Sequence, residues 1–306
     1  MDKIKIIFLG TSQAIPTAAR NHTSILLQYK NENMLFDCGE GTQRQFRKVK
    51  INMGKITRLF ISHWHGDHIL GLPGLLQTLA LSNYSKTLYV YGPRGTRKFM
   101  DLMLRIFVYV GKIKVEIREV NEIGNGKILE TSDFEIHAEK MEHGAPCLAY
   151  SFVEKDKIRI NKKKLREFKI KNSPLLARLK EGKDVFINNR KLRAIELTYR
   201  AKGRKISIIM DTKINSGIEK LAKNSDLMIC EATYLENSEN GKKLASEYKH
   251  LTAKQAGEIA RKAGAKMLVL THLSQRYEHK EKLILEEAKK VFKNSRIAED
   301  LMRIDL

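Results

Sequence analysis

Apolar side chains in the first part of the chain gather in short runs that end on glycine, asparagine or acidic residues. Runs of this length, rich in Ile, Leu and Phe and bounded by turn residues, are typical of buried β-strands. The pattern therefore predicts strands within residues 4–10, 23–29, 33–42 and 57–63.

The next part of the chain adds longer apolar patterns that fit helices. We expect helices over 42–49, 69–82 and 96–111, with Pro73 tolerated because it lies in the first turns of its helix. Strands are expected within 87–93, 113–120, 134–144 and 147–153. Strands that follow one another in the chain favour antiparallel neighbours.

Residues 154–193 interrupt this alternation. They hold 15 Lys and Arg against 5 Asp and Glu, a net charge of +10, and few apolar runs of core type. We interpret them as an arm inserted into a single domain that spans residues 1–306. The alternative is an ordinary solvated helical hairpin.

The alternation of strands and helices resumes after the arm and completes an α/β pattern. Strands are expected within 205–212, 227–235 and 266–273, and helices within 217–226, 252–264 and 280–293. Thr252 is a credible N-cap, because its hydroxyl can accept a backbone N–H of the first turn.

Composition narrows the partner and the compartment. The 306-residue chain carries a net charge of +22, which favours a polyanionic partner, nucleic acid above all, over a membrane surface or a merely basic exterior. No apolar run is long enough to span a membrane, and the first residues do not resemble a secretion signal. Three widely spaced cysteines do not form a disulfide framework, so we expect a cytoplasmic protein.

The hexapeptide HWHGDH at residues 63–68 is the clearest indication of metal binding in the sequence. His63 and His65 are two apart in extended chain and can grip one ion, whereas Asp67 and His68 follow Gly66 and point elsewhere. One loop can thus supply two ligands to each of two neighbouring metals.

Three further candidate ligands lie where an apolar run gives way to a loop: His143, Asp211 and His272. His and Asp are suitable zinc ligands, and strand ends at one edge of a sheet can converge. His137 competes with His143, but it lies in the middle of an expected strand, so we prefer His143.

These residues, in this order, resemble the metallo-β-lactamase superfamily. The segments FLGTSQAIPTAARN, LFDCGEGTQRQF, HWHGDHILGLPGLL, VYGPRG, CEATY and EYKHLTAKQAGEIARKAGAKMLVLTHLSQRY narrow the resemblance to the RNase Z family, which processes tRNA 3′ ends, over nearly the whole chain. The resemblance implies an αββα sandwich with a dinuclear zinc site, two Zn²⁺ per subunit.

The resemblance also implies roles for individual residues. His63, His65 and His143 would hold one zinc, Asp67, His68 and His272 the other, and Asp211 would be shared. Asp67 would also accept the proton of the attacking water. His250 would lie beside the scissile phosphate, and Glu231 would support it.

The arm would be the exosite, by which one subunit of a homodimer grips the tRNA bound to the other. Its candidate RNA-binding residues are Lys162, Lys163, Lys164, Arg166 and Arg178. Two positions depart from the family pattern: Ser173-Pro174 replaces a Gly-Pro of the arm, and Met210 stands where glycine is common before Asp-Thr.

The expected reaction is hydroxide attack on a precursor tRNA phosphodiester, assisted by two metals and leaving a 3′-hydroxyl on the tRNA and a 5′-phosphate on the trailer. Two other interpretations compete with it. The first is another hydrolase of the same fold, a small-molecule phosphodiesterase or a lactonase. The second is an RNA-binding protein without catalysis.

Overall fold

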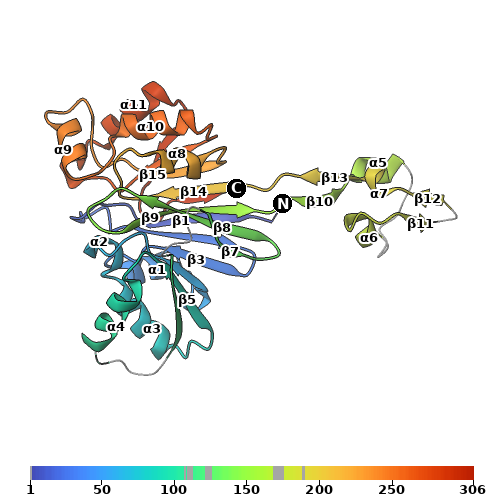
Figure 1. Ribbon diagram of the computed structural model, residues 1–306, viewed down its shortest axis with the longest axis horizontal. Helices are drawn as coiled ribbons and strands as arrows, with labels where there is room; N and C mark the ends of the chain where they lie inside the picture. Colours follow the sequence, from blue (N-terminus) through green and yellow to red (C-terminus); the bar gives the residue numbers. More distant parts are fainter. Residues whose placement is uncertain (1, 107, 109–112, 121–125, 168–175, 188–189) are drawn as a thin grey trace.

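Two seven-stranded β-sheets pack face to face, with helices on both outer faces (Figure 1). The structure is a computed structural model that describes residues 2–106, 108, 113–120, 126–167, 176–187 and 190–306. The α/β class and the αββα sandwich expected from the resemblance are both confirmed. Two of the expected features, the Ser173-Pro174 departure and the end of the helix over 96–111, lie outside the described residues.

The first sheet is formed by the N-terminal strands and closed by the last strand of the chain. Its order is β18-β1-β2-β3-β4-β5-β6. The strands are β1 (Ile4–Gly10), β2 (Ser24–Tyr29), β3 (Glu32–Phe36), β4 (Arg58–Phe60), β5 (Thr87–Gly92), β6 (Lys114–Glu119) and β18 (Arg303–Asp305).

The second sheet has the order β17-β16-β15-β14-β9-β8-β7. The strands are β7 (Gly126–Glu130), β8 (Phe134–Met141), β9 (Cys147–Glu154), β14 (Lys205–Ile209), β15 (Leu227–Glu231), β16 (Leu268–Thr271) and β17 (Ser295–Ile297).

Strand pairing in both sheets is mixed. Strands β1 to β3 and β7 to β9 pair antiparallel, as expected, but β3 to β6 pair parallel and so do β14 to β17. The expectation of antiparallel neighbours, which concerned the strands before the arm, was therefore wrong for β3 to β6. The reason is that helices connect these strands, and a helical crossover returns the chain in the same direction.

Helices cover the outer face of each sheet (Figure 1). Those of the N-terminal half are α1 (Thr42–Lys48), α2 (Gly66–Ile69), α3 (Leu72–Leu81) and α4 (Thr96–Ile106). Those of the C-terminal half are α8 (Ser216–Ala222), α9 (Gly241–Glu247), α10 (Ala253–Lys262) and α11 (Glu281–Val291). Pro73 lies in the first turn of α3, and Thr252 caps α10 with a capping box, as expected.

Apolar side chains fill three layers of this sandwich. One cluster lies between the two sheets and includes Phe8, Phe60 and Phe152. The other two lie between each sheet and its helices. Burial on both faces explains why so many strands are continuous apolar runs rather than alternating ones. None of the described helices is long and apolar enough to cross a membrane.

The basic segment projects from the sandwich as an arm (Figure 1). Its foot is a ribbon in which β10 (Lys157–Ile160) pairs antiparallel with β13 (Thr198–Ala201), so the projection runs from 157 to 201 and both boundaries lie after those expected. Beyond the ribbon lie α5 (Lys162–Glu167), α6 (Leu176–Lys180), β11 (Val185–Ile187), β12 (Arg190–Leu192) and α7 (Ala194–Leu197).

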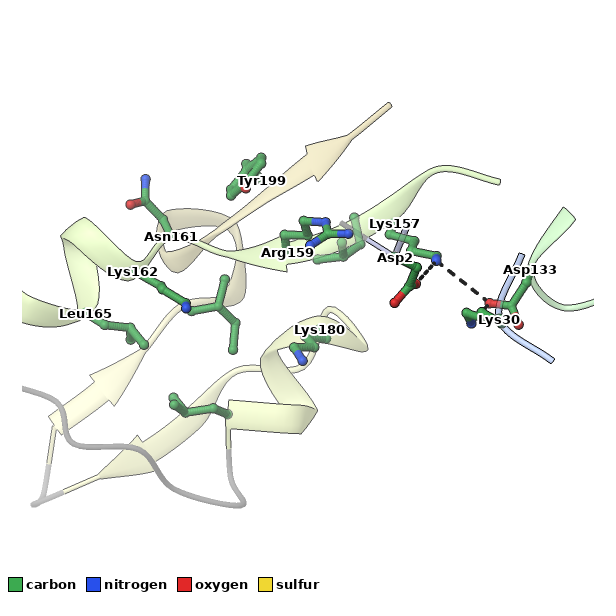
Figure 2. A pocket seen from close by; sticks show the side chains of 13 residues that line it. Asp2, Lys30, Asp133, Lys157, Arg159, Asn161, Lys162, Leu165, Lys180 and Tyr199 are labelled. Atoms are coloured by element: carbon green, nitrogen blue, oxygen red, sulfur yellow. Dashed lines mark hydrogen bonds and ion pairs between the residues drawn. The ribbon is translucent and has the colours of Figure 1, made fainter. Parts of the chain in front are cut away.

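The arm has a small apolar core of its own, where the sequence suggested almost none. Leu179 and Leu197 are almost fully buried there, with Leu176 and Leu192 beside them. The projecting segment is therefore a folded unit with short helices and a hairpin, not a helical hairpin. At its foot, the Lys157 ammonium donates to a carboxylate oxygen of Asp2, 2.8 Å away, which ties the ribbon to the sandwich (Figure 2).

Candidate metal centre

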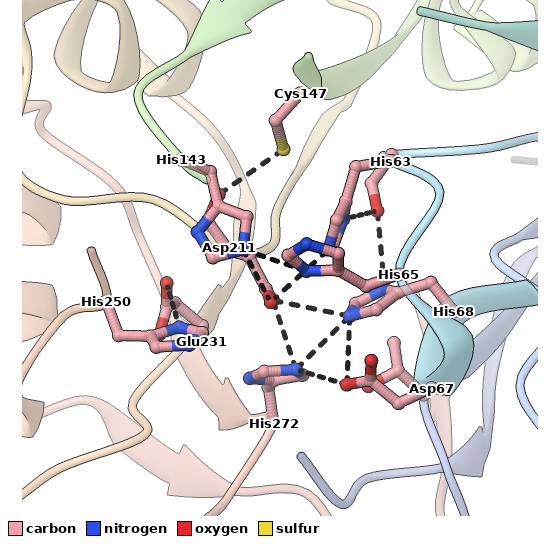
Figure 3. A network of polar contacts seen from close by, with 12 residues as sticks. His63, His65, Asp67, His68, His143, Cys147, Asp211, Glu231, His250 and His272 are labelled. Atoms are coloured by element: carbon pink, nitrogen blue, oxygen red, sulfur yellow. Dashed lines mark hydrogen bonds and ion pairs between the residues drawn. The ribbon is translucent and has the colours of Figure 1, made fainter. Parts of the chain in front are cut away.

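Seven side chains predicted to bind metal meet at one edge of the sandwich, where strands of both sheets end (Figure 3). They come from the loop after β4, from α2, and from the ends of β8, β14 and β16. The seven are His63, His65, Asp67, His68, His143, Asp211 and His272. Segments separated by more than two hundred residues thus contribute to one cluster.

The HWHGDH loop changes from extended chain to helix, and this change places its four polar side chains in the cluster. His65 has extended dihedral angles and stands at the N-cap of α2, which Gly66 opens. The chain changes direction at Gly66 without a positive φ there. Because the helix starts at this residue, Asp67 and His68 point away from the direction of His63 and His65.

The cluster separates into two sets that share Asp211. One set is His63, His65, His143 and Asp211, and the other is Asp67, His68, Asp211 and His272; within each set the ligand atoms lie within 4.8 Å of one another. Asp211 Oδ2 lies 3.6 Å from the Nε2 atoms of both His63 and His143. Asp211 Oδ1 lies 3.4 Å from His68 Nε2 and 3.0 Å from His272 Nε2. Each carboxylate oxygen therefore faces a different set.

Several atoms of the cluster are arranged as ligands of a cation rather than as hydrogen-bond partners of one another. His68 Nε2 and His272 Nε2 lie 3.3 Å apart. Among the described residues, His63 Nε2 and Asp211 Oδ1 are buried without a hydrogen-bond partner of acceptable geometry. Buried polar atoms are normally paired, so these point to a ligand between them. Imidazole and carboxylate donors of this kind suit zinc.

The buried ionisable side chains of the cluster shift one another's pKa values strongly. Burial raises the pKa of Asp211, but His272 and His68 lower it more, so it lies well below its usual range. The pKa of Asp67 is likewise lowered, because His68 and His272 outweigh the effect of burial. Burial keeps the pKa of His63 well below its ordinary value, as a neutral metal ligand requires.

His250 and Glu231 lie beside this cluster and form a pair. His250 Nδ1 lies 3.1 Å from Glu231 Oε2 and 3.2 Å from Oε1. Its ring centroid is 5.2 Å from that of His143 and 5.5 Å from that of His272. Burial lowers the pKa of His250, but the carboxylates of Glu231 and Asp211 outweigh burial and raise it to about 9.

Three buried residues at the centre were not singled out from the sequence: Asp37, Ser62 and Thr233. Asp37 Oδ2 accepts a hydrogen bond from the His68 ring, 2.8 Å away, and Asp37 lies at the end of β3 with a positive φ of 57°. Its position at the end of an apolar strand matched that of Asp211 and was the signal available. Ser62 and Thr233 carried no such signal.

Other residues weighed from the sequence lie elsewhere. His137 is bonded to Glu135 on β8, so it does not compete with His143. Trp64 turns away from the cluster, because its Nε1–H donates to Thr96 Oγ1 and its ring packs against Phe99. Met210 is buried between the sheets. The five candidate RNA-binding residues are all exposed on the arm.

Curated relatives match this chain along almost its entire length. Ribonuclease Z of Methanothermobacter thermautotrophicus is 38% identical over 304 residues, which cover 99% of this chain and 97% of the relative. Ribonuclease Z of Listeria welshimeri is 39% identical over 97% of this chain and 98% of the relative. The chain belongs to the ribonuclease Z family.

Solved structures agree with membership in the ribonuclease Z family. Human tRNase Z, short form, superposes with a TM-score of 0.72 at 29% identity and covers 98% of both chains. The metallo-beta-lactamase fold protein YhfI from Bacillus subtilis gives a TM-score of 0.70 at 20% identity over all of both chains, a likeness of fold alone.

One family model also matches the chain. The model described as Anti-Pycsar protein Apyc1 covers residues 4–156, half of the chain, so the chain falls within the family that this model describes as well. The matched half includes the HWHGDH loop and His143. It ends before Asp211, His250 and His272, whereas the matches with the ribonuclease Z relatives extend over both ligand sets.

Proposed function

We propose that this protein is a zinc-dependent endoribonuclease that removes the 3′ trailer from precursor tRNA. Family membership supports the reaction, and the human relative of similar structure is named a tRNase Z. The observation that carries the chemistry is the pair of ligand sets that share Asp211 at one edge of the sandwich.

Two divalent cations fit the two ligand sets. His63, His65 and His143 would hold one, Asp67, His68 and His272 the other, and Asp211 would belong to both sets. When bound, such a pair supplies a nucleophile near neutral pH and neutralises charge on the phosphate. We assign zinc, two ions per subunit, because five histidines and two carboxylates suit it.

The protein's own groups move the protons. We assign Asp67 as the acceptor of the proton that water loses. The lowered pKa of Asp67 would make it a weak base, but the charge of His68 contributes most to this lowering, and a neutral histidine ligand would not exert it.

His250 is the corresponding donor to the leaving 3′ oxygen. Its raised pKa keeps the ring protonated near neutral pH, and Glu231 anchors Nδ1 so that Nε2 is free to face the substrate. Leaving oxygens of phosphodiesters are poor leaving groups, so a donor at this atom lowers the barrier for the departure step.

The arm supplies affinity for tRNA. Lys162, Lys163, Lys164 and Arg166 lie exposed on α5, just beyond the ribbon, and Arg178 is exposed on α6. The pocket between the ribbon and α6 is lined by further cations, Lys157, Arg159 and Lys180 among them (Figure 2). Contacts of lysine and arginine with phosphates give affinity without reading bases, so the arm would recognise the shape of tRNA.

The position of the arm supports its use by a partner subunit of a homodimer. Strand β9 begins near His143 and ends at the foot of the arm, and an eight-residue strand spans about 25 Å. The arm therefore leaves the sandwich at the end opposite the metal centre (Figure 1). A tRNA held by this arm can then place its 3′ end in the metal centre of a second copy. We expect this dimer in the cytoplasm.

One experiment separates this function from its rivals. The protein is incubated with a 3′-extended precursor tRNA and, separately, with an aryl phosphodiester and a lactone, with and without a chelator. We expect metal-dependent cleavage of the tRNA that is far more efficient than hydrolysis of either small molecule. Efficient hydrolysis of a small molecule alone would indicate another hydrolase of this fold, and tRNA binding without cleavage would indicate a binding protein.

A further inference from the structure

Four histidine rings at the metal centre turn their Nδ1 atoms toward buried oxygens. His63 Nδ1 lies 3.0 Å from Ser62 Oγ, and His68 Nδ1 lies 2.8 Å from Asp37 Oδ2. On the other side of the centre, His272 Nδ1 lies 3.0 Å from Thr233 Oγ1, and His250 Nδ1 lies 3.1 Å from Glu231 Oε2 (Figure 3 labels these four rings). These contacts leave Nε2 as the free nitrogen of each ring.

The available hydrogens determine which nitrogen carries a proton in the rings of His63 and His68. The Ser62 hydroxyl donates to Asp37 Oδ2, 2.8 Å away, so its single hydrogen is used and Oγ can only accept from His63 Nδ1–H. An ionised carboxylate only accepts, so His68 must also donate from Nδ1. The backbone N–H of Ser62 donates to Asp37 Oδ1 and completes the arrangement.

The same reasoning determines that Nδ1 carries a proton in the rings of His272 and His250. The Thr233 hydroxyl lies 2.7 Å from Glu231 Oε2 and 3.1 Å from the carbonyl oxygen of His272, and its single hydrogen goes to one of these acceptors, with Glu231 the nearer. Thr233 Oγ1 therefore accepts from His272 Nδ1–H. Glu231 also receives His250 Nδ1–H, and its Oε1 accepts the backbone N–H of Thr212, 2.6 Å away. Thr233 and Glu231 are fully buried, so water does not compete for these bonds.

The two arrangements have the same chemistry in unrelated segments of the chain. In each, one buried hydroxyl and one buried carboxylate connect two histidines and hold a proton on both Nδ1 atoms. The first connects a ligand of one ion set, His63, with a ligand of the other, His68. The second connects the ligand His272 with the proton donor His250.

We propose that Ser62 and Thr233 are positioning residues which, with Asp37 and Glu231, form two hydroxyl–carboxylate relays that present the Nε2 atoms of these histidines to the metals and the substrate. This inference rests on the proposed function, because the relays matter only if Nε2 binds a cation or faces the phosphate. Partners of this kind orient metal-bound histidines and raise their basicity.

The two hydroxyls can be removed with little change of shape. The test uses Ser62→Ala and Thr233→Val, with Thr233→Ser as the variant that restores a hydroxyl. Ser151→Ala is the matched control, because Ser151 is equally buried in the second sheet and bonds Ser207 but contacts none of the site histidines. Zinc affinity is measured by competition with a chelator, and folding is checked by circular dichroism.

Zinc affinity is expected to fall about 10–100-fold in Ser62→Ala and in Thr233→Val, and to stay at the wild-type value in Ser151→Ala. Thr233→Ser should recover most of the loss. In addition, nitrogen-15 NMR of the zinc-loaded protein should show slowly exchanging Nδ1–H protons for His63 and His272 in wild type. Each of these signals should disappear in the variant that lacks its hydroxyl.

Wild-type affinity and unchanged Nδ1–H signals in folded Ser62→Ala and Thr233→Val would overturn the relays and leave the proposed function standing. Failure of the wild-type protein itself to bind zinc would overturn the proposed function and the relays with it. Equal losses of zinc in Ser151→Ala would also overturn the relays, because they would then reflect general damage to the sheets.

Discussion

The metal centre collects buried side chains from strand ends and loops spread over most of the chain, whereas the arm is one continuous segment with its charges in solvent. In the centre, Asp211, His68 and His272 are almost completely buried and contact one another directly. On the arm, the side chains of Lys162, Lys163 and Lys164 are exposed to solvent.

This difference separates two tasks of the proposed enzyme. Buried charges interact strongly and need fixed geometry, which is what bond cleavage requires. Solvated charges act at longer range, are screened by salt and tolerate substitution, which suits affinity for a polyanion. Damage to the centre should therefore abolish chemistry on every substrate, and damage to the arm should affect only precursor tRNA.

The largest effect is expected from Asp211→Ala, because both ligand sets use this carboxylate. Cleavage of precursor tRNA and of an aryl phosphodiester should both fall by more than the roughly 10²–10³-fold that loss of a single transition-state contact costs. Bound zinc should fall in parallel, as measured by mass spectrometry of the metal content. Retention of both ions would contradict the shared ligand.

His250→Ala should come next, with a single-turnover rate lower by about 10²–10⁴-fold and zinc content unchanged. His137→Ala is the matched control, because that histidine is also paired with a glutamate but lies on β8 away from the centre. An unchanged rate in His250→Ala would remove this residue from the mechanism.

The pH dependence sharpens the same prediction. A proton donor must be protonated, so the wild-type single-turnover rate should fall as the pH rises through the pKa of His250. That pKa is about 9 without metal, and nearby cations would lower it. The falling limb should therefore lie at or below about pH 9 and be missing from His250→Ala.

Trimming the arm should have a smaller and selective effect. Because Ile160 pairs with Thr198, residues 161–197 can be replaced by an Asn-Gly turn that closes the ribbon as a hairpin. We expect kcat/KM for precursor tRNA to fall about tenfold or more, since several phosphate contacts are lost, while aryl phosphodiester hydrolysis is retained. Equal loss on both substrates would show that the arm supports the fold of the centre.

The smallest effect is expected from Lys162, Lys163 and Lys164 replaced together by Ala. Each lost phosphate contact should reduce the slope of log affinity against log salt by about 1, with no change in cleavage position. Lys282, Lys289 and Lys290, exposed on α11 at the other end of the molecule, form the matched control triple. The same change of slope in both triples would mean that the arm has no special role.

Most of the predictions about the metal centre came from residues at the ends of expected strands. His143, Asp211 and His272 each follow an apolar run, and HWHGDH packs four polar groups into one loop, so their convergence was predictable. Ser62 and Thr233 were not, because a single hydroxyl has no pattern and matters only through the two groups that folding places on either side of it.

The arm was predicted through its charge, but its architecture was not. The apolar residues of the arm stand singly or in short runs among lysines, so they do not form a recognisable core pattern in the sequence. Leu179 and Leu197 become a core only when α6 and α7 fold against each other. Its boundaries were displaced for a similar reason, because the ribbon that ends at Ala201 contains no long apolar run. Parallel pairing in half of each sheet follows from crossover helices between the strands, and because helices were expected at these places from the sequence, this pairing was predictable.

The most direct measurement is the chemistry of the two ends made when a 3′-extended precursor tRNA is cut in the presence of zinc. Attack by water at the metal centre, with His250 donating to the 3′ oxygen, predicts a 3′-hydroxyl on the tRNA and a 5′-phosphate on the trailer. A 2′,3′-cyclic phosphate with a 5′-hydroxyl trailer would contradict the account, because the nucleophile would then be the ribose and not water.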